Sequence, residues 1–328
     1  MRKIVSAILA AVLLMSLSGC AQTAKTSTTS KTATTSSAKK DIKDIKIGVT
    51  FQGLSDAFIV RLSNSFEKEA KSKGVQLSIG DGKMDAATQV SQVENFIAQK
   101  VDVIIIDPIS SSGCAPAVDD AIAAGIPIIT LIQTTSNQTK ATAYVGSDAV
   151  ESGKIETQML VKDLGGKGNI VVMDGQMGGD AQIGRDNGMK STLQGTQIKI
   201  LAEQTANWDR EQAVKLMENW ITSHSNIDAV LAQNDEMALG AVQVIKEKNL
   251  AGKIKVYGID AEAEALTDVS SGIMEGTVFQ NAEEQGKECV DVAINCAQGQ
   301  KLNADYYIPY EGVRAADVPT YKAKLGIK

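Results

Sequence analysis

Polar side chains with planar groups follow several short apolar runs of the sequence, at the point where each run ends. Each of them is a carboxylate or an amide: Asp107, Gln133, Asn234, Asp260 and Gln280. Such a group forms two hydrogen bonds side by side, a geometry that matches adjacent hydroxyl groups on a ring. Asp and Asn also favour turns and helix N-caps, so the indication comes from the repetition of the pattern and not from any single position. The pattern favours binding of a polyhydroxy ligand over covalent chemistry.

Two aromatic residues and one arginine extend this set of candidate ligand-binding residues. Phe58 follows Asp56 just after the first apolar run, and Trp208 lies in a loop between an expected strand and an expected helix. A flat ring there packs on the C–H face of a sugar or cyclitol while amides bind its edge. Arg185 stands at the start of an expected helix, where its guanidinium either donates to two ring oxygens or pairs with a neighbouring carboxylate.

The elements that position these residues alternate between β-branched runs and segments of helical periodicity from Ile45 onward. Helices are expected at 57–73, 84–99, 114–124, 149–163, 181–194, 209–222, 235–249 and 283–298. This alternation predicts an α/β fold with doubly wound parallel sheets, whose strands are buried on both faces. Ligands bind outside the carboxyl ends of the strands in such sheets, so the polar residues above are expected to meet there. The number of strands and a break near 146–149 predict two lobes.

The first 20 residues are typical of an export signal. Arg2 and Lys3 precede an uncharged apolar run at 4–17, which is too short to span a bilayer. Small residues then lead to Cys20, and this pattern resembles the lipobox of bacterial lipoproteins, in which the cysteine is lipidated. The next 20 residues include 11 Ser or Thr and cannot form a core. We therefore expect a signal peptide at 1–19 and a flexible tether at 20–43.

Charge and composition exclude other classes of protein. The 328 residues include 33 Lys or Arg and 39 Asp or Glu, and the net charge of -6 argues against a partner that is a nucleic acid. A hydrophobic fraction of 43% is enough to build two cores. The three cysteines other than Cys20 are an odd number, so no disulfide framework is implied.

From about Ile45 to Lys328 the sequence resembles the monosaccharide-binding proteins of ABC importers, the ribose, galactose and inositol type with the type I periplasmic-binding fold. The segments that carry the resemblance are IGVTFQGLSDAF at 47–58, YVGSDAVESGK at 144–154, TANWDREQAV at 205–214, AQNDEMALGA at 232–241, VYGIDAEAEA at 256–265 and GTVFQNAEEQG at 276–286. It implies two lobes joined by three crossovers near 147, 281 and 309, with the ligand enclosed by closure of the hinge. The N-terminal lobe would contain 44–147 and 281–308, and the C-terminal lobe 148–280 and 309–328.

The resemblance also implies which residues contact a monosaccharide or cyclitol. It places Asp56 and Phe58 on the first lobe, and most of the remaining contacts on the second lobe and the hinge. Asp107 occupies a position at which galactose-type relatives have a contacting Asn. With Gln133 from the strand-end pattern, the predicted ligand-binding residues are Asp56, Phe58, Asp107, Gln133, Arg185, Trp208, Asn234, Asp260 and Gln280. No cofactor is implied.

The sequence departs from this family pattern at three places. Relatives usually have Asn or Asp at the end of the fourth strand, whereas this chain has Ile132 followed by Gln133. Gly179 stands where the glucose and galactose binders have a sugar-contacting His. The turn at 164–169 has no series of carboxylates like the calcium loop of those binders, so we expect no metal site. The segment TANWDR followed by LMENW most resembles inositol-type and related uncharacterised binders.

Three other functions fit parts of the sequence. A secreted glycosidase would place Asp56 and Asp260 on opposite sides of the ligand, but the only His is His224 and no motif of a nucleophile or a metalloenzyme is present. A repressor of the same fold needs a helix-turn-helix where this chain has the signal and the tether. A receptor for a sensor or chemotaxis partner would have the same ligand site.

The sequence therefore predicts a non-enzymatic binding protein with a defined location. We expect a monomer that is exported and held at the outer face of the cytoplasmic membrane by a lipid on Cys20. Its closed form would dock onto the permease subunits of an ABC importer.

Overall fold

The computed structural model describes residues 39–327, which form one compact unit. The predicted signal peptide, Cys20 and most of the predicted tether lie outside the described residues. The described end of that tether contacts the folded unit, because Lys40 Nζ lies 2.6 Å from a carboxylate oxygen of Asp102. A short 3-10 helix, η1 (Ile42–Asp44), follows it.

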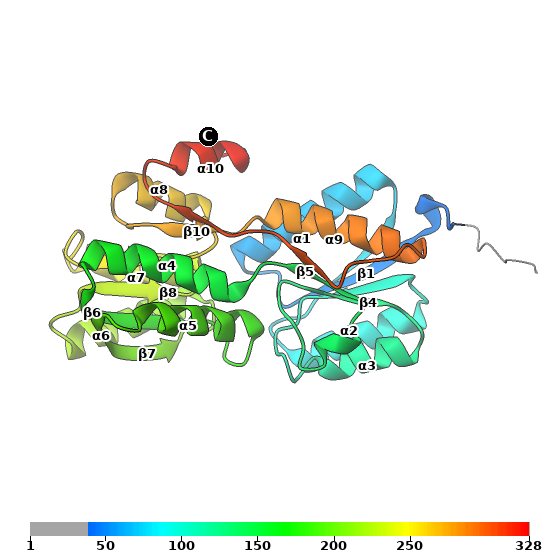
Figure 1. Cartoon of the computed structure of the whole chain (residues 1–328), viewed down its shortest axis with the longest axis horizontal. Coiled ribbons are helices and arrows are strands. Elements are labelled where there is room, and N and C mark those ends of the chain that lie inside the picture. Colours follow the sequence, from blue (N-terminus) through cyan, green and yellow to red (C-terminus); the bar gives the residue numbers. More distant parts are fainter. Residues whose placement is uncertain (1–38, 328) are drawn as a thin grey trace, which may run out of the picture. The chain divides into compact units, whose positions relative to one another are not determined.

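The first lobe is built on a sheet of six parallel strands with the order β11-β5-β4-β3-β1-β2 (Figure 1). Their bounds are β1 Lys46–Phe51, β2 Gln76–Asp81, β3 Val103–Ile106, β4 Ile128–Leu131, β5 Ala143–Gly146 and β11 Asp305–Tyr307. Helices α1 (Ala57–Lys73) and α9 (Ala282–Ala297) cover one face of the sheet, and α2 (Ala86–Ala98) and α3 (Ala115–Ala123) cover the other. All four residues of β3 are buried, as expected for a strand covered on both faces.

The second lobe contains four parallel strands with the order β7-β6-β8-β9. Their bounds are β6 Lys167–Asp174, β7 Gln197–Thr205, β8 Ala229–Ala232 and β9 Lys255–Tyr257. Two parallel bridges, Tyr257 to Gly276 and Asp260 to Phe279, continue this sheet toward β10 (Thr277–Phe279). β10 in turn pairs antiparallel with β12 (Glu311–Val313).

Helices cover both faces of this second sheet. One core joins the sheet to α6 (Arg210–Ser223), α7 (Asp235–Glu247), α8 (Ala263–Ser271) and α10 (Val318–Lys324). A smaller core lies under α4 (Ala149–Leu164) and α5 (Asp180–Leu193), which pack closely on each other. The backbones of these two helices approach so closely that a side chain at Gly153 or Gly188 would collide with the facing helix.

The chain passes between the lobes at three points. It crosses between β5 and α4, between β10 and α9, and between β11 and β12. Each of the first two crossings is only two residues long, and the third is three residues long. The predicted α/β class with two doubly wound lobes and a three-crossover hinge is therefore confirmed.

Several helices begin at side-chain caps that the sequence supplies directly after a strand. Asp56, Asp148, Asp209 and Asn234 each accept a hydrogen bond from a backbone N–H in the first turn of the helix that they precede. Because a parallel strand ends where the next helix begins, these caps gather at the carboxyl edges of the sheets.

Each of the eight predicted helices is present, with ends within two residues of the prediction. The sequence did not reveal α8, α10 or the short strands β5, β11 and β12. The two helices have nine and seven residues, and β11 and β12 have three residues each, so they are too short to show a clear periodicity. Cys114 and Cys289 are buried thiols, and Cys296 is partly buried. Within residues 39–327, no helix has the length and apolarity needed to cross a bilayer.

Candidate ligand-binding site

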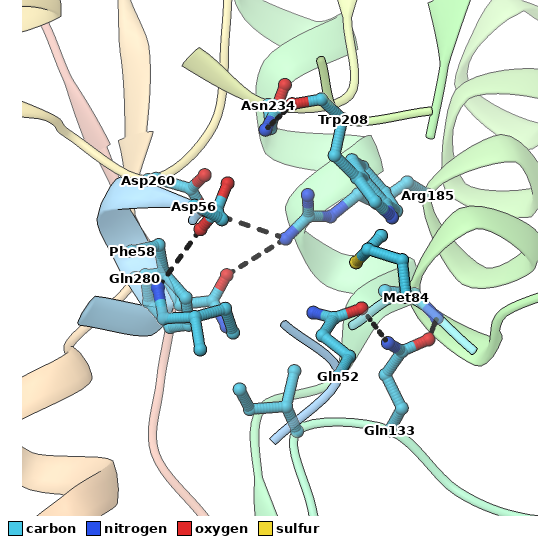
Figure 2. Close-up of a pocket in the computed structure, with 13 residues that line it drawn as sticks. Gln52, Asp56, Phe58, Met84, Gln133, Arg185, Trp208, Asn234, Asp260 and Gln280 are labelled. Atoms are coloured by element: carbon cyan, nitrogen blue, oxygen red, sulfur yellow. Dashed lines mark hydrogen bonds and ion pairs between the residues drawn. The ribbon is translucent and has the colours of Figure 1, made fainter. Parts of the chain in front are cut away.

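A cavity lies between the two lobes, at the carboxyl ends of the strands (Figure 2). The lining residues are Gln52, Asp56, Phe58, Ile59, Met84, Ile132, Gln133, Ala181, Arg185, Trp208, Asn234, Asp260 and Gln280. The structure thus brings together eight of the nine residues predicted from the sequence, and Asp107 is the one that it leaves out of the wall.

The first lobe contributes Asp56 and Phe58 through the start of α1. Asp56 Oδ1 accepts a hydrogen bond from the backbone N–H of Ile59 at 3.0 Å, and Phe58 is buried in the first turn. Burial raises the pKa of Asp56, although the hydrogen bond from Ile59 opposes the shift. One oxygen of this carboxylate therefore caps the helix, which leaves the other available to a ligand.

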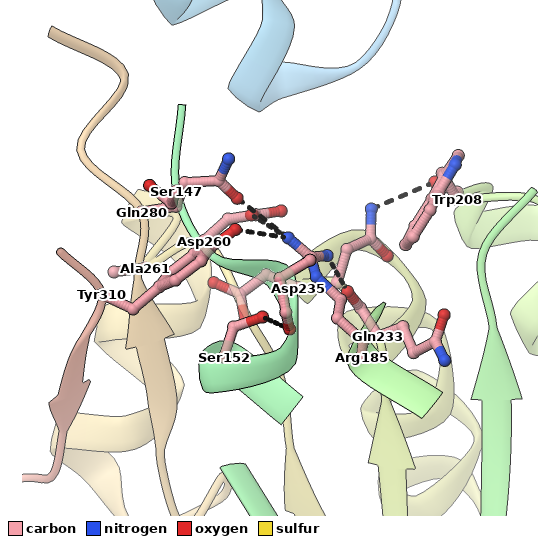
Figure 3. A network of polar contacts seen from close by, with 12 residues as sticks. Ser147, Ser152, Arg185, Trp208, Gln233, Asp235, Asp260, Ala261, Gln280 and Tyr310 are labelled. Atoms are coloured by element: carbon pink, nitrogen blue, oxygen red, sulfur yellow. Dashed lines mark hydrogen bonds and ion pairs between the residues drawn. The ribbon is translucent and has the colours of Figure 1, made fainter. Parts of the chain in front are cut away.

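Arg185 is the central cation of the site and comes from α5 (Figure 3). Its side chain is buried, and its Nη2 donates to Gln280 Oε1 at 2.9 Å and lies 3.9 Å from Asp260 Oδ1. Its Nη1 donates to the backbone carbonyl of Gln233. Its Nε is buried with no hydrogen-bond partner among the described residues, so the guanidinium retains an unused donor.

The surroundings of Arg185 keep its positive charge. Burial alone would lower the pKa of Arg185, but the nearby Tyr310, Asp260 and Glu156 raise it. Burial raises the pKa of Asp260 and of Glu156 well above the ordinary value, and Arg185 only partly opposes this. The site thus has one fixed cation among acids that resist ionisation.

The indole of Trp208 forms one flat wall of the cavity. The guanidinium carbon of Arg185 lies 5.4 Å from the centroid of the ring, and the carbonyl oxygen of Trp208 accepts a 3.4 Å hydrogen bond from Asn234 Nδ2. The ring also lies directly on Gly175, where an added Cβ atom would stand 2.0 Å from the ring atoms. Gly175 is therefore required for the position of the indole.

Four of the lining residues have left-handed backbone conformations that L-amino acids rarely adopt. The φ angles are 57° at Met84, 60° at Ile132, 64° at Trp208 and 127° at Asp260. Conformations of this kind cost about 1–3 kcal/mol each and gather at functional sites. Their concentration around one cavity supports a functional role for it.

Gln133 connects the two lobes at the cavity wall. Its Nε2 donates to Gln52 Oε1 at 3.3 Å, and its Oε1 accepts from the backbone N–H of Ala181 in the second lobe at 3.2 Å. An added Cβ atom at Gly179 would lie 2.7 Å from the same oxygen, so a side chain there would disturb this contact. Both polar ends of the Gln133 amide are thus occupied by protein.

Asp107 lies behind the cavity wall and not in it, which differs from the sequence-based prediction. The residue is fully buried, and its Oδ2 is 3.4 Å from the backbone nitrogen of Gln52, a lining residue. Its Oδ1 has no hydrogen-bond partner among residues 39–327. Burial raises the pKa of Asp107 to about 8. The Asp107 side chain therefore contacts the backbone at the end of β1 from behind the cavity wall.

Five lining residues lie outside the predicted set. Ile132 was noted only as a departure from the family pattern, and Gln52, Ile59, Met84 and Ala181 were not identified from the sequence. Gln52 directly follows β1, so the strand-end argument applies to it as well. Met84 is an apolar residue in the polar turn after β2, a weak signal that is visible in the sequence. Ile59 and Ala181 lie in helices and carry no such signal.

Direct contacts between the lobes close the rim of the cavity. Arg61 Nη2 of α1 lies 3.2 Å from the carbonyl oxygen of Asp260 and 3.2 Å from Glu262 Oε1. On another part of the rim, the backbone N–H of Thr134 donates to Asp180 Oδ2 at 3.2 Å. The lobes therefore meet in a closed arrangement around the cavity.

A family model described as a periplasmic binding protein domain matches residues 47–301. The chain belongs to this family. Relatives include a putative rhizopine-binding protein from Rhizobium meliloti, with 36% identity over 286 residues, 85% of this chain and 93% of the relative. A xylitol-binding protein from Mycolicibacterium smegmatis is 37% identical over 80% of this chain and 76% of the relative. The ribose import binding protein of Bacillus subtilis is 34% identical over 80% of this chain and 85% of the relative.

Solved structures of periplasmic binding proteins share the fold of this family member. An ABC transporter solute-binding protein from Bacillus halodurans with bound myo-inositol has a TM-score of 0.83 and 37% identity, covering 87% of this chain and 99% of its own. One from Actinobacillus succinogenes with bound D-allose has a TM-score of 0.80 and 32% identity, covering 85% and 100%. The fructose-binding periplasmic domain of a hybrid two-component system has a TM-score of 0.81 and 25% identity, covering 86% and 94%.

Family membership makes this periplasmic binding protein a solute-binding protein and not an enzyme. In the part of the chain that the structure describes, no group of three or more His, Cys, Asp or Glu side chains is arranged to hold a metal ion. The wall of the cavity offers hydrogen-bonding groups, one cation and aromatic surfaces to a solute.

Proposed function

We propose that this periplasmic binding protein captures a monosaccharide or cyclitol between its lobes and delivers it to an ABC importer. The observation that carries the proposal is the composition of the enclosed cavity. The indole of Trp208 offers a flat apolar surface, and Arg185, Asp260 and Gln280 form a connected polar group beside it. A ring with an apolar face and a hydroxylated edge matches both parts.

The proposed roles of the lining residues follow from their contacts. Asp56, Asn234, Asp260 and Gln280 would bind hydroxyl groups. Arg185 would donate from its unpaired Nε, as the burial of this atom without a partner suggests. Trp208 and Phe58 would cover the faces of the ring. Gln133 would act at the lobe contact, and Asp107 would act indirectly by supporting Gln52.

The comparisons support this ligand class. The relatives are named for rhizopine, xylitol and ribose, and the similar structures contain myo-inositol and D-allose. The structure with myo-inositol combines the higher TM-score and the higher identity of these two. We therefore place myo-inositol first among the candidates.

The lobe boundaries in this proposal are those of the sequence analysis. Residues 44–147 and 281–308 would move as one body, and 148–280 and 309–328 as the other. The three short crossings between the sheets support this division, because few residues there need to change conformation when the lobes separate.

The protein is extracytoplasmic, and we propose that a lipid on Cys20 holds the monomer at the outer face of the cytoplasmic membrane. The apolar run at 4–17 and the small residues before Cys20 support this anchor. Replacing Cys20 by Ala in the full chain should release the protein from the membrane fraction. Retention of the variant in that fraction would contradict the proposed lipid anchor. Sedimentation of residues 39–328 tests whether the protein is a monomer.

A receptor role for a sensor partner is the second candidate, since the fold of a sensor's fructose-binding domain is similar. The two roles differ in the partner and not in the pocket. Ligand-dependent co-purification with permease subunits favours import, and co-purification with a sensor kinase favours the receptor.

Thermal unfolding of residues 39–328 tests the ligand proposal. The protein is first unfolded and refolded to remove carried-over ligand, and then heated with myo-inositol, D-ribose, D-xylose, D-galactose, D-glucose or L-arabinose. A ligand at 100 times its Kd adds about 2.7 kcal/mol to the free energy of unfolding and raises the midpoint by a few degrees. The absence of a shift with every compound would contradict the proposed ligand class.

A further inference from the structure

We propose that Met84 sets the upper size limit of the ligand, because its side chain separates the binding cavity from a larger outer cavity. This inference rests on the proposed function, since it assumes that the inner cavity binds a ring compound. The outer cavity is open to solvent and includes polar side chains such as Gln176, Asn207 and Gln212 in its lining. Its lining suits a polar substituent on the ring.

The two cavities share one wall. Asp56, Met84 and Trp208 are the three residues that line both of them. Figure 2 shows the Met84 side chain among the lining residues of the inner cavity. A group attached to a ring in the inner cavity would reach the outer one past these three side chains.

Met84 is the least constrained of the three side chains in this shared wall. Asp56 is fixed by its hydrogen bond to the first turn of α1, and the ring of Trp208 lies directly on Gly175. The thioether of Met84 makes no hydrogen bond in the described part of the chain, and the residue as a whole is 36% exposed. A single shortened side chain at this position therefore joins the cavities, while the other two walls remain.

The backbone fixes the position from which Met84 projects. Its φ angle of 57° is left-handed, and its N–H donates to the carbonyl oxygen of Gln52 at 2.7 Å. Asp85, the next residue, caps α2 through Thr88. Ala and Leu share the steric restriction of Met at such a φ angle, so both are backbone-matched substitutions.

Gly53 supports the Met84 side chain from one side. A Cβ atom added at this buried glycine would lie 3.0 Å from Met84 Sδ and 3.3 Å from its Cγ. The Gly53→Ala change therefore displaces the Met84 side chain. This effect disappears when Met84 is already Ala, which makes the two changes non-additive.

Calorimetric titration of the full chain in detergent, or of the compact unit 39–328, tests the proposal. The probes are myo-inositol, D-ribose, D-xylose and D-galactose, together with the O-methyl and O-galactosyl derivatives of whichever parent binds. The measured quantity is the ratio of Kd for the parent to Kd for each derivative. Met84→Leu is the matched variant that keeps the bulk, and Met177→Ala removes an exposed Met that lines neither cavity.

We expect Met84→Ala to raise this ratio at least tenfold for the O-galactosyl derivative, while Met84→Leu and Met177→Ala change it less than threefold. A ratio that stays within threefold in Met84→Ala, or that rises equally in Met84→Leu, overturns the proposal. Failure of the proposed function is recognised separately, because then no parent compound binds the unchanged protein. A Gly53→Ala change that alters this Kd ratio equally in the unchanged protein and in Met84→Ala also counts against the proposal.

Discussion

Gln133 at the end of β4 caps a helix of the other lobe: its Oε1 accepts the backbone N–H of Ala181 in the first turn of α5. The contact is reciprocal, since Asp180 Oδ2 accepts the N–H of Thr134. The first N–H groups of a helix have no partners within the helix. When the lobes separate, this N–H of α5 loses its partner, so closure of the cleft and capping of α5 are linked.

We predict that Gln133→Ala weakens ligand binding roughly fivefold, because a hydrogen bond made only in the closed form contributes about 1 kcal/mol. The thermal midpoint of the ligand-free protein should change little. Gln133→Glu is the matched variant, because a carboxylate still accepts from Ala181 at the helix N-terminus although it cannot donate to Gln52. Calorimetric titration measures both variants. A loss of more than 100-fold in both would instead assign Gln133 a direct contact with the ligand.

Removal of the Arg185 charge should destabilise the protein strongly. Arg185→Met removes buried hydrogen bonds to the carbonyl oxygen of Gln233 and to Gln280 Oε1, and it leaves Asp260 without its nearby cation. Breaking a buried pair in this way costs about 3–5 kcal/mol where the carboxylate is ionised. The cost should be smaller at pH 5 than at pH 8, because protonation removes the charge of the remaining carboxylates. Urea unfolding at both pH values measures it.

Lys190→Met on the same helix is the control for Arg185. Lys190 is exposed and pairs with Asp186 at 2.8 Å, so its loss should change the unfolding free energy by less than about 1 kcal/mol. Equal effects of the two substitutions would show that the buried network contributes little.

The indole of Trp208 should contribute to affinity and little to folding. We predict that Trp208→Ala weakens ligand binding by about 1–3 kcal/mol, as for other aromatic contacts that bury a partner. Gly175→Ala should weaken binding similarly, because the added methyl group forces the ring away. Trp220→Phe is the control, since Trp220 lies in the core of α6 and should affect stability alone. Unchanged affinity in Trp208→Ala would make its ring a packing group.

The strand-end rule explains why much of the site could be predicted from the sequence. In a parallel sheet, every strand end faces the same edge, so Asn234, Asp260 and Gln280 meet without any knowledge of long-range contacts. The rule gives position along the chain and not side-chain direction. Asp107 also follows a strand, but its side chain points at the backbone of Gln52 behind the wall.

The remaining site features depend on contacts between distant segments. Tyr310 reaches Arg185 only because β12 returns to the second lobe, and β12 is too short to be recognised in the sequence. The role of Gly175 is defined by the indole that lies on it, 33 residues further along the chain. Left-handed φ angles at Met84 and Ile132 likewise arise from the folded structure, since neither residue type favours them.

The pKa of Asp107 makes stability depend on pH in a defined direction. Burial raises this pKa to about 8 in the folded protein, whereas an unfolded Asp has a pKa near 3.9. Between these values the folded state binds more protons than the unfolded state, so stability falls as pH rises. We predict that Asp107→Asn, which cannot ionise, gains stability relative to the unchanged protein between pH 5 and pH 8, by a few kcal/mol with about 4 as the upper bound.

Urea unfolding of both proteins at pH 5, 6, 7 and 8 measures this difference. Burial also raises the pKa of Glu262 and Asp174 to about 7, but these groups titrate in both proteins and cancel in the comparison. Asp120→Asn, at an exposed position of α3, is the control for the substitution itself. A constant difference for Asp107→Asn, or one that shrinks with rising pH, would mean that Asp107 is already ionised in the folded protein at pH 5.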